Sequence, residues 1–333
     1  MRPRVLLVLA ALTLSLLLPA AVGARSAQSA AKAEHDRIVA YWTPARMAAA
    51  KPKDFARDPA SGKLVPAKGK PGGGGGGSGA VTGASWTGNG EIEKRSGKLY
   101  FSTSGGNWQC TASVISDAST SNGYSTILTA GHCTFDAGEG WSFNVQYIPD
   151  FDDAPVACGQ TVYGCWTGAT KLAINSDFGT GFGPDAALRV DYGIMRLGLG
   201  GKSGNAELDA VTGGYTLKTS GVGLGDTQWA FGYPAAGKYR GKDLTYCKGT
   251  TINDPQGVGT WGMACNMTGG SSGGPWLTGT TNPADGSGQL SSLNSYGYQG
   301  LTYMFGPRFD GETSTVLADA IDGSFTAGVS IVH

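Results

Sequence analysis

The chain has 333 residues and 56 glycines, carries no net formal charge, and only 15% of its residues are charged. The charge is unevenly distributed, because residues 1–80 hold 12 Lys/Arg against 4 Asp/Glu (+8) while residues 81–333 hold 13 against 21 (−8). An acidic main part argues against a nucleic-acid partner, since phosphates require a basic face. The asymmetry predicts instead that the basic N-terminal part complements the acidic remainder, an attraction that salt would weaken.

The N-terminus has the three-part pattern of a secretory signal peptide. Arg2 and Arg4 precede an apolar run from Val5 to Leu18, and small residues follow through Ala24. The run is shorter than the ~20 residues of a membrane span, and no later segment is long and apolar enough to cross a bilayer. We therefore expect residues 1–24 to be removed, the protein to be secreted, and no membrane attachment to remain.

Residues 25–71, called the leader below, precede a linker at residues 72–80. Pro44 followed by the helix-forming residues 46–50 predicts a short helix within the leader. Six consecutive glycines from Gly72 to Gly77 cannot pack a core and indicate a flexible connection. The leader is then a propeptide, with an ordinary disordered N-terminal arm as the alternative.

The body, residues 81–333, alternates short apolar segments with turns rich in Gly, Ser, Asn and Asp. Many short strands separated by turn signals indicate an all-β fold, either a sandwich or a barrel. A short helix is predicted at Thr313 to Ile321, near the C-terminus. The predicted strands are residues 98–103, 110–115, 125–129, 141–147, 191–197, 228–233, 244–251, 275–278 and 290–298.

A candidate general base follows one of these strands. The chain has three histidines, and His132 lies in Thr129-Ala130-Gly131-His132-Cys133, where a small-residue turn ends a strand. A lone histidine is usually a satisfied core residue. The adjacent Cys133 and the serine-containing loop further along the chain favour a catalytic role here.

A carboxylate that could orient this imidazole opens the strand at residues 191–197. Burying Asp191 at the start of an apolar strand is costly unless something pairs with it, so we expect it to pair with His132. Asp177 and Asp185 are nearby competitors, but neither leads into a comparable apolar strand. Asp191 is therefore the predicted partner.

The third segment is Thr268-Gly269-Gly270-Ser271-Ser272-Gly273-Gly274-Pro275. A Gly/Ser cluster is more often only a turn. Glycines nevertheless allow a substrate carbonyl to approach the main chain, and N–H groups that converge on one point stabilise an oxyanion. With a base and an acid already in place, the loop is predicted to carry a serine nucleophile.

Together the three segments resemble the chymotrypsin-like serine peptidases, over about residues 96 to 310. The order His, Asp, Ser is that of this family, whereas subtilisins and α/β-hydrolases order the same groups differently. The resemblance implies two six-stranded antiparallel β-barrels with a crossover at about residues 198–214. It also implies a secreted serine endopeptidase that is a monomer, needs no cofactor or metal and acts on proteins or peptides. In the implied roles, His132, Asp191 and Ser272 form the triad, and the N–H groups of Gly270 and Ser272 form the oxyanion hole.

Specificity is less well defined by the sequence. Trypsin-like members select Arg or Lys with an aspartate six positions before the serine, and that position here is Asn266. Residues 265–270 resemble secreted bacterial peptidases related to the glutamyl endopeptidases, which use a pocket histidine near the segment matching residues 294–297. No histidine occurs there. Asn266, Ser295 and Gly297 are the predicted substrate-binding residues, with Ser295 and Gly297 lining the pocket and pairing with the substrate backbone.

Six cysteines agree with an oxidising compartment. Six cysteines allow fifteen pairings, and closeness along the chain suggests Cys158–Cys165 and Cys247–Cys265. The family resemblance implies Cys110–Cys133, which would brace the histidine turn. A zinc site is the competing use, but the sequence has no Cys-x-x-Cys pair or His-Glu-x-x-His helix.

Two alternative functions use the same fold. One is a catalytically inactive binding protein, which would usually have lost a triad residue, and the other is an esterase with the same chemistry. The leader is expected to act as an inhibitor or a folding aid. Trypsin-like zymogens need an aspartate just before the catalytic serine, and Ser271 stands there instead. We therefore expect no N-terminal ammonium switch.

Overall fold

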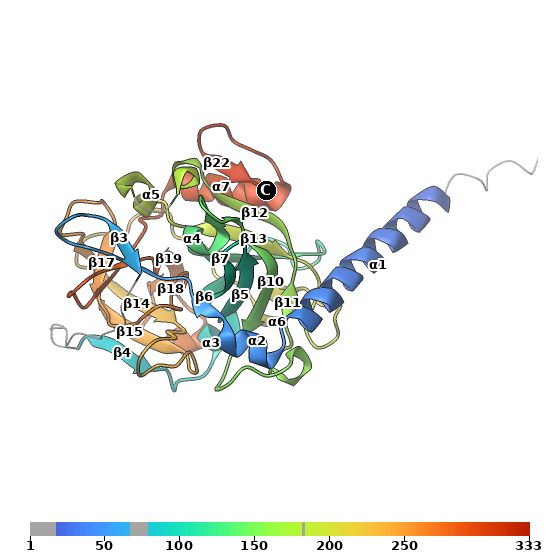
Figure 1. Ribbon diagram of the computed structural model, residues 1–333, viewed down its shortest axis with the longest axis horizontal. Helices are drawn as coiled ribbons and strands as arrows, with labels where there is room; N and C mark the ends of the chain where they lie inside the picture. The colour runs from blue at the N-terminus through green and yellow to red at the C-terminus, as the bar shows by residue number, and fades with distance from the viewer. Residues whose placement is uncertain (1–17, 67–78, 182–183) are drawn as a thin grey trace, which may run out of the picture.

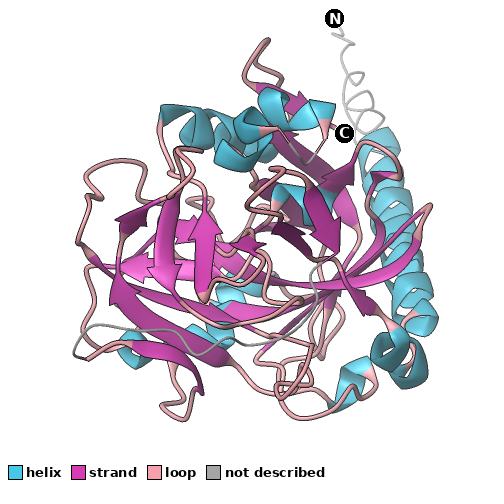
Figure 2. Cartoon of the chain, turned by 60° about the vertical axis from the view of Figure 1, so that its left-hand side comes forward, coloured by secondary structure: helices cyan, strands magenta, loops and turns pink. Residues whose placement is uncertain are grey.

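The computed structural model describes residues 18–66, 79–181 and 184–333. The predicted apolar run of the signal peptide up to residue 17 and the six-glycine linker lie outside the described residues. The body consists mainly of antiparallel strands that curl into two units packed side by side (Figures 1 and 2). The all-β, two-barrel expectation is confirmed.

The first barrel contains the histidine and aspartate segments. Its sheet has the order β11-β10-β5-β6-β7-β13-β12-β22, and all five residues of β7 are buried. The strands β7 and β13 pair in register from Gly193↔Thr129 to Leu197↔Ser125, so the ends that precede His132 and follow Asp191 lie together. The strands are β5 (Ser96–Thr103), β6 (Gly106–Ile115), β7 (Ser125–Thr129), β10 (Phe143–Pro149), β11 (Trp166–Thr167), β12 (Ala169–Asn175), β13 (Gly193–Leu197) and β22 (Ser330–Val332).

The second barrel contains the serine loop. It combines a five-stranded sheet of order β19-β18-β14-β15-β4 with a three-stranded sheet of order β16-β17-β21. The serine loop leads directly into β18. The strands are β4 (Val81–Ser85), β14 (Thr227–Gly232), β15 (Thr245–Thr250), β16 (Ile252–Asn253), β17 (Trp261–Ala264), β18 (Pro275–Thr278), β19 (Gln289–Leu293) and β21 (Tyr303–Gly306).

A long connection and a C-terminal helix join the two barrels. The chain leaves β13 at Leu197 and enters β14 at Thr227, and α6 (Leu208–Thr212) lies in between. The predicted C-terminal helix is α7 (Gly311–Asp322), which begins where the Asp310 side chain accepts the N–H groups of residues 312 and 313. It ends at Gly323, whose φ of +75° suits glycine. α7 packs on β12, β13 and β22 of the first barrel.

The remaining elements of the body are short. They are α3 (Glu91–Arg95), α4 (Gly131–Thr134), α5 (Asp185–Arg189), the hairpin of β8 (Phe135–Asp136) and β9 (Gly140–Trp141), and β20 (Gly297–Tyr298). Three 3-10 turns are η1 (Cys158–Gln160), η2 (Ser176–Thr180) and η3 (Pro283–Asp285).

The described part of the leader, up to residue 66, is folded and lies across both barrels (Figure 1). Its long helix α1 (Leu18–Tyr41) packs on β10 and β11, and α2 (Pro44–Ala49) begins with Pro44 after an N-cap at Thr43, as the sequence predicts for this short helix. β1 (Lys51–Pro52) then pairs with β6 of the first barrel, while β2 (Phe55–Arg57) pairs with β20 and with β3 (Leu64–Pro66). No helix within the described ranges is long and apolar enough to span a membrane.

Candidate active site

His132 is held rigidly at the end of β7. The one-turn helix α4 carries it, and the disulfide Cys110–Cys133 ties that turn to β6 with the two Cα atoms 6.5 Å apart. The side chain is buried, and its Nδ1 lies 2.8 Å from Asp191 Oδ2. Because a carboxylate only accepts hydrogen bonds, this contact places a hydrogen on Nδ1 and leaves Nε2 to face the cleft.

Asp191 is fully buried and satisfied by three donors. Its Oδ1 accepts the His132 backbone N–H at 2.9 Å, and its Oδ2 accepts His132 Nδ1 and, at 2.5 Å, the Ser295 hydroxyl. These donors explain how a carboxylate is tolerated in the core. The competitors lie elsewhere: Asp185 pairs with Arg57 at 2.6 Å, and Asp177 lies in η2.

The serine loop is fastened to the ends of the first-barrel strands. The backbone N–H of Thr111 donates to Ser272 O at 2.8 Å, and its hydroxyl donates to Gly270 O at 2.9 Å. A Cβ on Gly273 would lie 2.2 Å from Thr129 Oγ1 and 2.7 Å from Ala130 N, so only glycine permits this approach. The loop therefore places Ser272 beside the turn that carries His132.

Hydrogen bonds to two carbonyl groups of the serine loop fix the peptide planes and so determine where the N–H groups of the following residues point. Gly269 O accepts from Ala235 N at 2.6 Å, and Ser271 O accepts from Gly274 N at 2.9 Å. The C=O and N–H of one trans peptide point in opposite directions. The N–H groups of Gly270 and Ser272 are consequently turned away from these anchors, as an oxyanion hole requires.

The three predicted substrate-binding residues have different surroundings. Gly297 forms part of β20, whose backbone pairs with the leader strand β2 in the register Ala56↔Gly297. Ser295 uses its hydroxyl to hold Asp191, a supporting role that its sequence context did not indicate. Asn266 is half-buried, and its Oδ1 accepts a hydrogen bond from the Tyr239 hydroxyl.

The leader passes directly over His132. Lys53 O lies 3.2 Å from His132 Nε2, and the Phe55 ring meets the imidazole edge-on with centroids 5.7 Å apart. The next side chain, that of Asp54, lies against Gly269, where a Cβ on the glycine would be 2.4 Å from Asp54 Oδ2. Sequence reasoning missed these three residues, because nothing in this short segment of the leader indicates which residue will meet the site.

Burial raises the pKa of Asp54 to about 6 from an ordinary 3.8. The charge of His132 and backbone hydrogen bonds from Phe55 and Gly269 act in the opposite direction but do not outweigh the burial. The leader therefore places a weak acid, Asp54, in the cleft. Ionisation of this side chain disfavours binding of the leader there.

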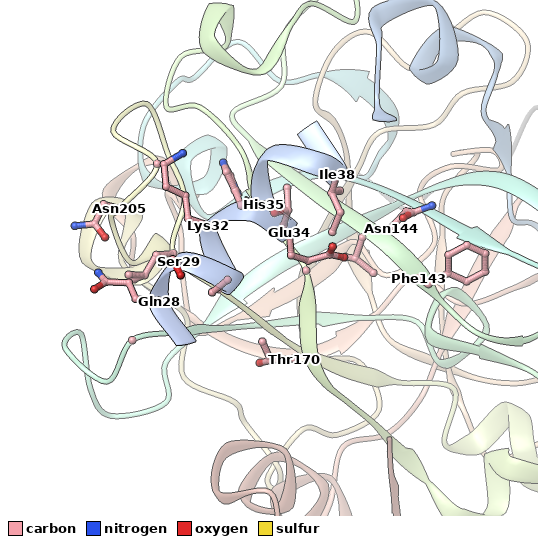
Figure 3. A pocket seen from close by; sticks show the side chains of 18 of the residues that line it. Gln28, Ser29, Lys32, Glu34, His35, Ile38, Phe143, Asn144, Thr170 and Asn205 are labelled. Carbon is pink, nitrogen blue, oxygen red and sulfur yellow. Dashed lines mark hydrogen bonds between the residues drawn. The ribbon is translucent and has the colours of Figure 1, made fainter. Parts of the chain in front are cut away.

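A cavity of ≈ 930 Å³ lies between α1 and the outer face of the first barrel (Figure 3). His35 and Ile38 of α1 line it together with Asn144 and Thr167, and His35 Nδ1 lies 2.8 Å from Thr167 Oγ1. Burial lowers the pKa of His35 more than the charge of Asp36 raises it. Because no triad residue lines this cavity, it belongs to the leader interface and not to the catalytic centre.

The cysteines form three disulfides, Cys110–Cys133, Cys158–Cys165 and Cys247–Cys265. The Sγ atoms of Cys110 and Cys133 and a His132 nitrogen all lie within 4.8 Å of one another. Both sulfurs are bonded to each other, so this group offers no thiolate for a metal.

No family model and no curated protein sequence matches the chain. Solved structures do: a thermostable serine protease AL20 from an extremophilic microorganism is 32% identical, with a TM-score of 0.57, covering 69% of this chain and 98% of its own. Protease Anisep from Arthrobacter nicotinovorans is 30% identical, with a TM-score of 0.59, covering 72% of this chain and 100% of its own. A Glu endopeptidase shares the fold at 19% identity, with a TM-score of 0.52 over 73% of this chain and 98% of its own.

The fold, the buried His–Asp pair and the glycine-rich serine loop define a chymotrypsin-like serine peptidase. The comparisons agree, and the chain belongs to this family. It is a serine-type endopeptidase.

Proposed function

We propose that the protein is a secreted endopeptidase that cleaves peptide bonds through an acyl-enzyme on Ser272. The observation that carries this proposal is the buried contact of 2.8 Å between His132 Nδ1 and Asp191 Oδ2, beside the serine loop. A serine hydroxyl is a weak nucleophile unless an adjacent base removes its proton. Asp191 holds a hydrogen on His132 Nδ1, so Nε2 is the atom that takes the serine proton once the leader has left the cleft.

The steps follow from the residues in place. Ser272 Oγ attacks the substrate carbonyl carbon while His132 takes its proton, and the developing oxyanion is bound by the N–H groups of Gly270 and Ser272. His132 then returns the proton to the leaving amine, which departs. Water attacks the acyl group by the same proton path and regenerates Ser272. Each oxyanion donor contributes about 3 kcal/mol of transition-state stabilisation.

The disulfides and the N-terminal apolar pattern support secretion. Gly297 is proposed to pair with the acyl half of the substrate, the half on the N-terminal side of the scissile bond. The leaving-group half then extends past His132 towards β6. A productive substrate therefore runs from β20 to β6.

The leader is proposed to be an inhibitor that lies in this cleft in the opposite direction. It meets β6 first, at Lys51↔Trp108, and β20 later, at Ala56↔Gly297, and both pairings are parallel. A carbonyl oxygen, Lys53 O, faces the base at 3.2 Å, where a substrate would present its leaving nitrogen. A reversed backbone blocks the cleft without presenting a carbonyl carbon correctly, which explains how a peptidase can hold its own leader uncut.

A sulfonyl fluoride tests the proposed nucleophile. We expect the secreted protease to be labelled at Ser272, as mapped by mass spectrometry, and we expect Ser272→Ala to lose about a millionfold in kcat while remaining folded. Labelling at Ser271, or full turnover in the Ala variant, would refute the assignment. Casein and nitrophenyl acetate separate the alternatives, because an esterase would turn over only the acetate and an inactive binding protein neither.

A further inference from the structure

A small acidic site beside the catalytic histidine holds the side chain of Lys53. The Lys53 ammonium lies 2.9 Å from Asp136 Oδ2 and 2.5 Å from Glu139 Oε2, and the lysine side chain is only 2% exposed. It also lies over the Trp108 ring, 4.4 Å from the centroid. Two carboxylates and an aromatic face are the groups that bind a cationic side chain.

The body positions these groups without help from the leader. Asp136 Oδ1 accepts the backbone N–H groups of Gly138 and Glu139 in the β8–β9 hairpin, at 2.8 and 3.1 Å. Glu139 Oε2 accepts the Thr103 hydroxyl at 2.6 Å, and the same hydroxyl accepts Trp108 Nε1 at 2.8 Å. The site is therefore built in advance and is not a chance meeting of flexible side chains.

Lys53 neutralises the pair of carboxylates. Asp136 and Glu139 are 25% and 27% exposed, and within residues 18–66, 79–181 and 184–333 Lys53 is the only cation paired with either. Burial raises the pKa of Asp136, but hydrogen bonds from Lys53 and from backbone N–H groups hold it below its usual value. When the leader leaves, two neighbouring negative charges are left unpaired, and they repel each other until another cation enters.

The position of the acidic site relative to His132 indicates which cation it binds. Lys53 is the residue whose carbonyl faces His132 Nε2, so the site lies within one residue of the reaction centre and on the β6 side. If the proposed function holds, this is the leaving-group side of the substrate. We infer that Asp136, Glu139 and Trp108 form a substrate subsite that selects Lys or Arg at the first or second residue after the scissile bond.

The inference deepens the proposed function and differs from trypsin-like selectivity. Selection of a basic residue in trypsin-like members occurs on the acyl side, where Asn266 stands in this chain. Here the positive side chain belongs to the product that leaves first. The leader then inhibits by filling this subsite with its own lysine.

The test uses the protease secreted from cells that express the full chain. A peptide library is digested and the new N-termini are sequenced by mass spectrometry. The preferred sequence is then made as quenched fluorescent peptides with Lys, its uncharged isostere norleucine, or Glu at each of the two positions. We expect kcat/KM for the Lys peptide to exceed that for the norleucine peptide by about tenfold at one position, with Glu disfavoured.

The matched variants are Asp136→Asn with Glu139→Gln, and Asp153→Asn as a control at an exposed pair with Lys242. We expect the Lys/norleucine ratio to fall to about one in the double variant and to persist in Asp153→Asn. If the double variant does not fold, the single variant Glu139→Gln replaces it in the test. Its Lys/norleucine ratio should lie between one and the wild-type value. A wild-type ratio of about one, or a ratio unchanged in the folded variants, overturns the inference.

Sulfonyl fluoride labelling of Ser272 is measured in the same samples. Labelled, active protein with no Lys preference refutes the subsite and leaves the proposed function standing. Absence of labelling and of peptide cleavage refutes the proposed function itself.

Discussion

Ser295 connects the two barrels through a single hydrogen bond. It follows β19 in the second barrel, whereas Asp191 belongs to the first, and the 2.5 Å contact between them fixes the carboxylate relative to the serine loop. The proton transfer depends on how His132 is oriented, and His132 is oriented by Asp191. Ser295 is therefore a positioning residue and not a substrate contact through its side chain.

We expect Ser295→Ala to lower kcat about tenfold with little change in KM, because the lost hydrogen bond acts on the charged form of the pair. Ser292→Ala is the matched control, since Ser292 is also buried and donates to Pro307 O at 2.7 Å. Both variants should lose similar stability in thermal unfolding. Equal losses of kcat in the two would show that Ser295 has only a structural role.

The raised pKa of Asp54 predicts that latency depends on pH. Well below pH 4 the group is neutral whether the leader is bound or free, so binding carries no penalty. As the pH rises towards 6, the Asp54 carboxyl ionises in the free leader but stays protonated in the bound leader. Inhibition therefore weakens by at most about a hundredfold, the ratio set by the pKa values of about 6 and 3.8. Above about pH 6 this contribution is fully lost.

The measurement is the initial activity of the uncut full chain between pH 4 and 7, divided at each pH by that of Asp54→Asn. The division removes the pH dependence of the chemistry itself. We expect the ratio to rise with pH. A flat ratio would show that Asp54 does not control release of the leader.

At the scale of elements, the leader is anchored by apolar side chains on the first barrel. Trp42, between α1 and α2, is 2% exposed, donates its indole N–H to Asn144 O at 2.5 Å and contacts the Tyr100 ring. Ile38 and Met47 are each 1% exposed in the same interface. These contacts hold the leader in place, whereas the parallel strands only determine where it passes.

Trp42→Ala should weaken leader binding by about 3–5 kcal/mol, the usual cost of deleting a buried aromatic side chain. The uncut chain should then show at least about a hundredfold more residual activity on a short peptide. Lys63→Ala, at an exposed position of the same leader, is the matched control and should leave latency unchanged. Equal latency in Trp42→Ala and the wild type would contradict the assignment of the anchor.

The sequence predicts the elements of the body better than those of the leader. β7, β13 and α7 follow from alternating apolar residues, a turn or a cap, all of which act locally. The helix α1 was not predicted, because its apolar residues complement the first barrel and form no strong stripe of their own. The contact of Ser295 with Asp191 and the acidic site around Lys53 also join segments far apart in the chain, and no local pattern marks such contacts.

In the molecule as a whole, the catalytic loop is already arranged while the leader is attached. The Ser271 hydroxyl donates to Thr268 O at 2.9 Å and closes the turn locally, where an aspartate would wait for a new N-terminus. β4, just after the linker, is already paired with β15. Under the proposed inhibition by the leader, latency comes from occupation of the cleft and not from a disordered site.

A processed protein whose N-terminus, created near residues 72–78, is extended by two alanines should keep its activity within about twofold. Such an extension would disrupt an ammonium–carboxylate switch. The measurement is kcat/KM at equal concentrations of titrated Ser272. Loss of most activity on extension would restore the N-terminal switch and refute control by occupation.

The leader contacts both barrels, so once the linker is cut we expect activation to depend on dissociation of the leader at low protein concentration. While the linker is intact, the leader meets the cleft at an effective concentration in the millimolar range, and one cut reduces this to the bulk concentration. The nicked protein should stay silent when concentrated and gain specific activity, after a lag, when diluted from about 10 μM to about 10 nM. Specific activity independent of concentration would contradict this. Export into a large volume would then itself start the enzyme, after the cut has made it ready.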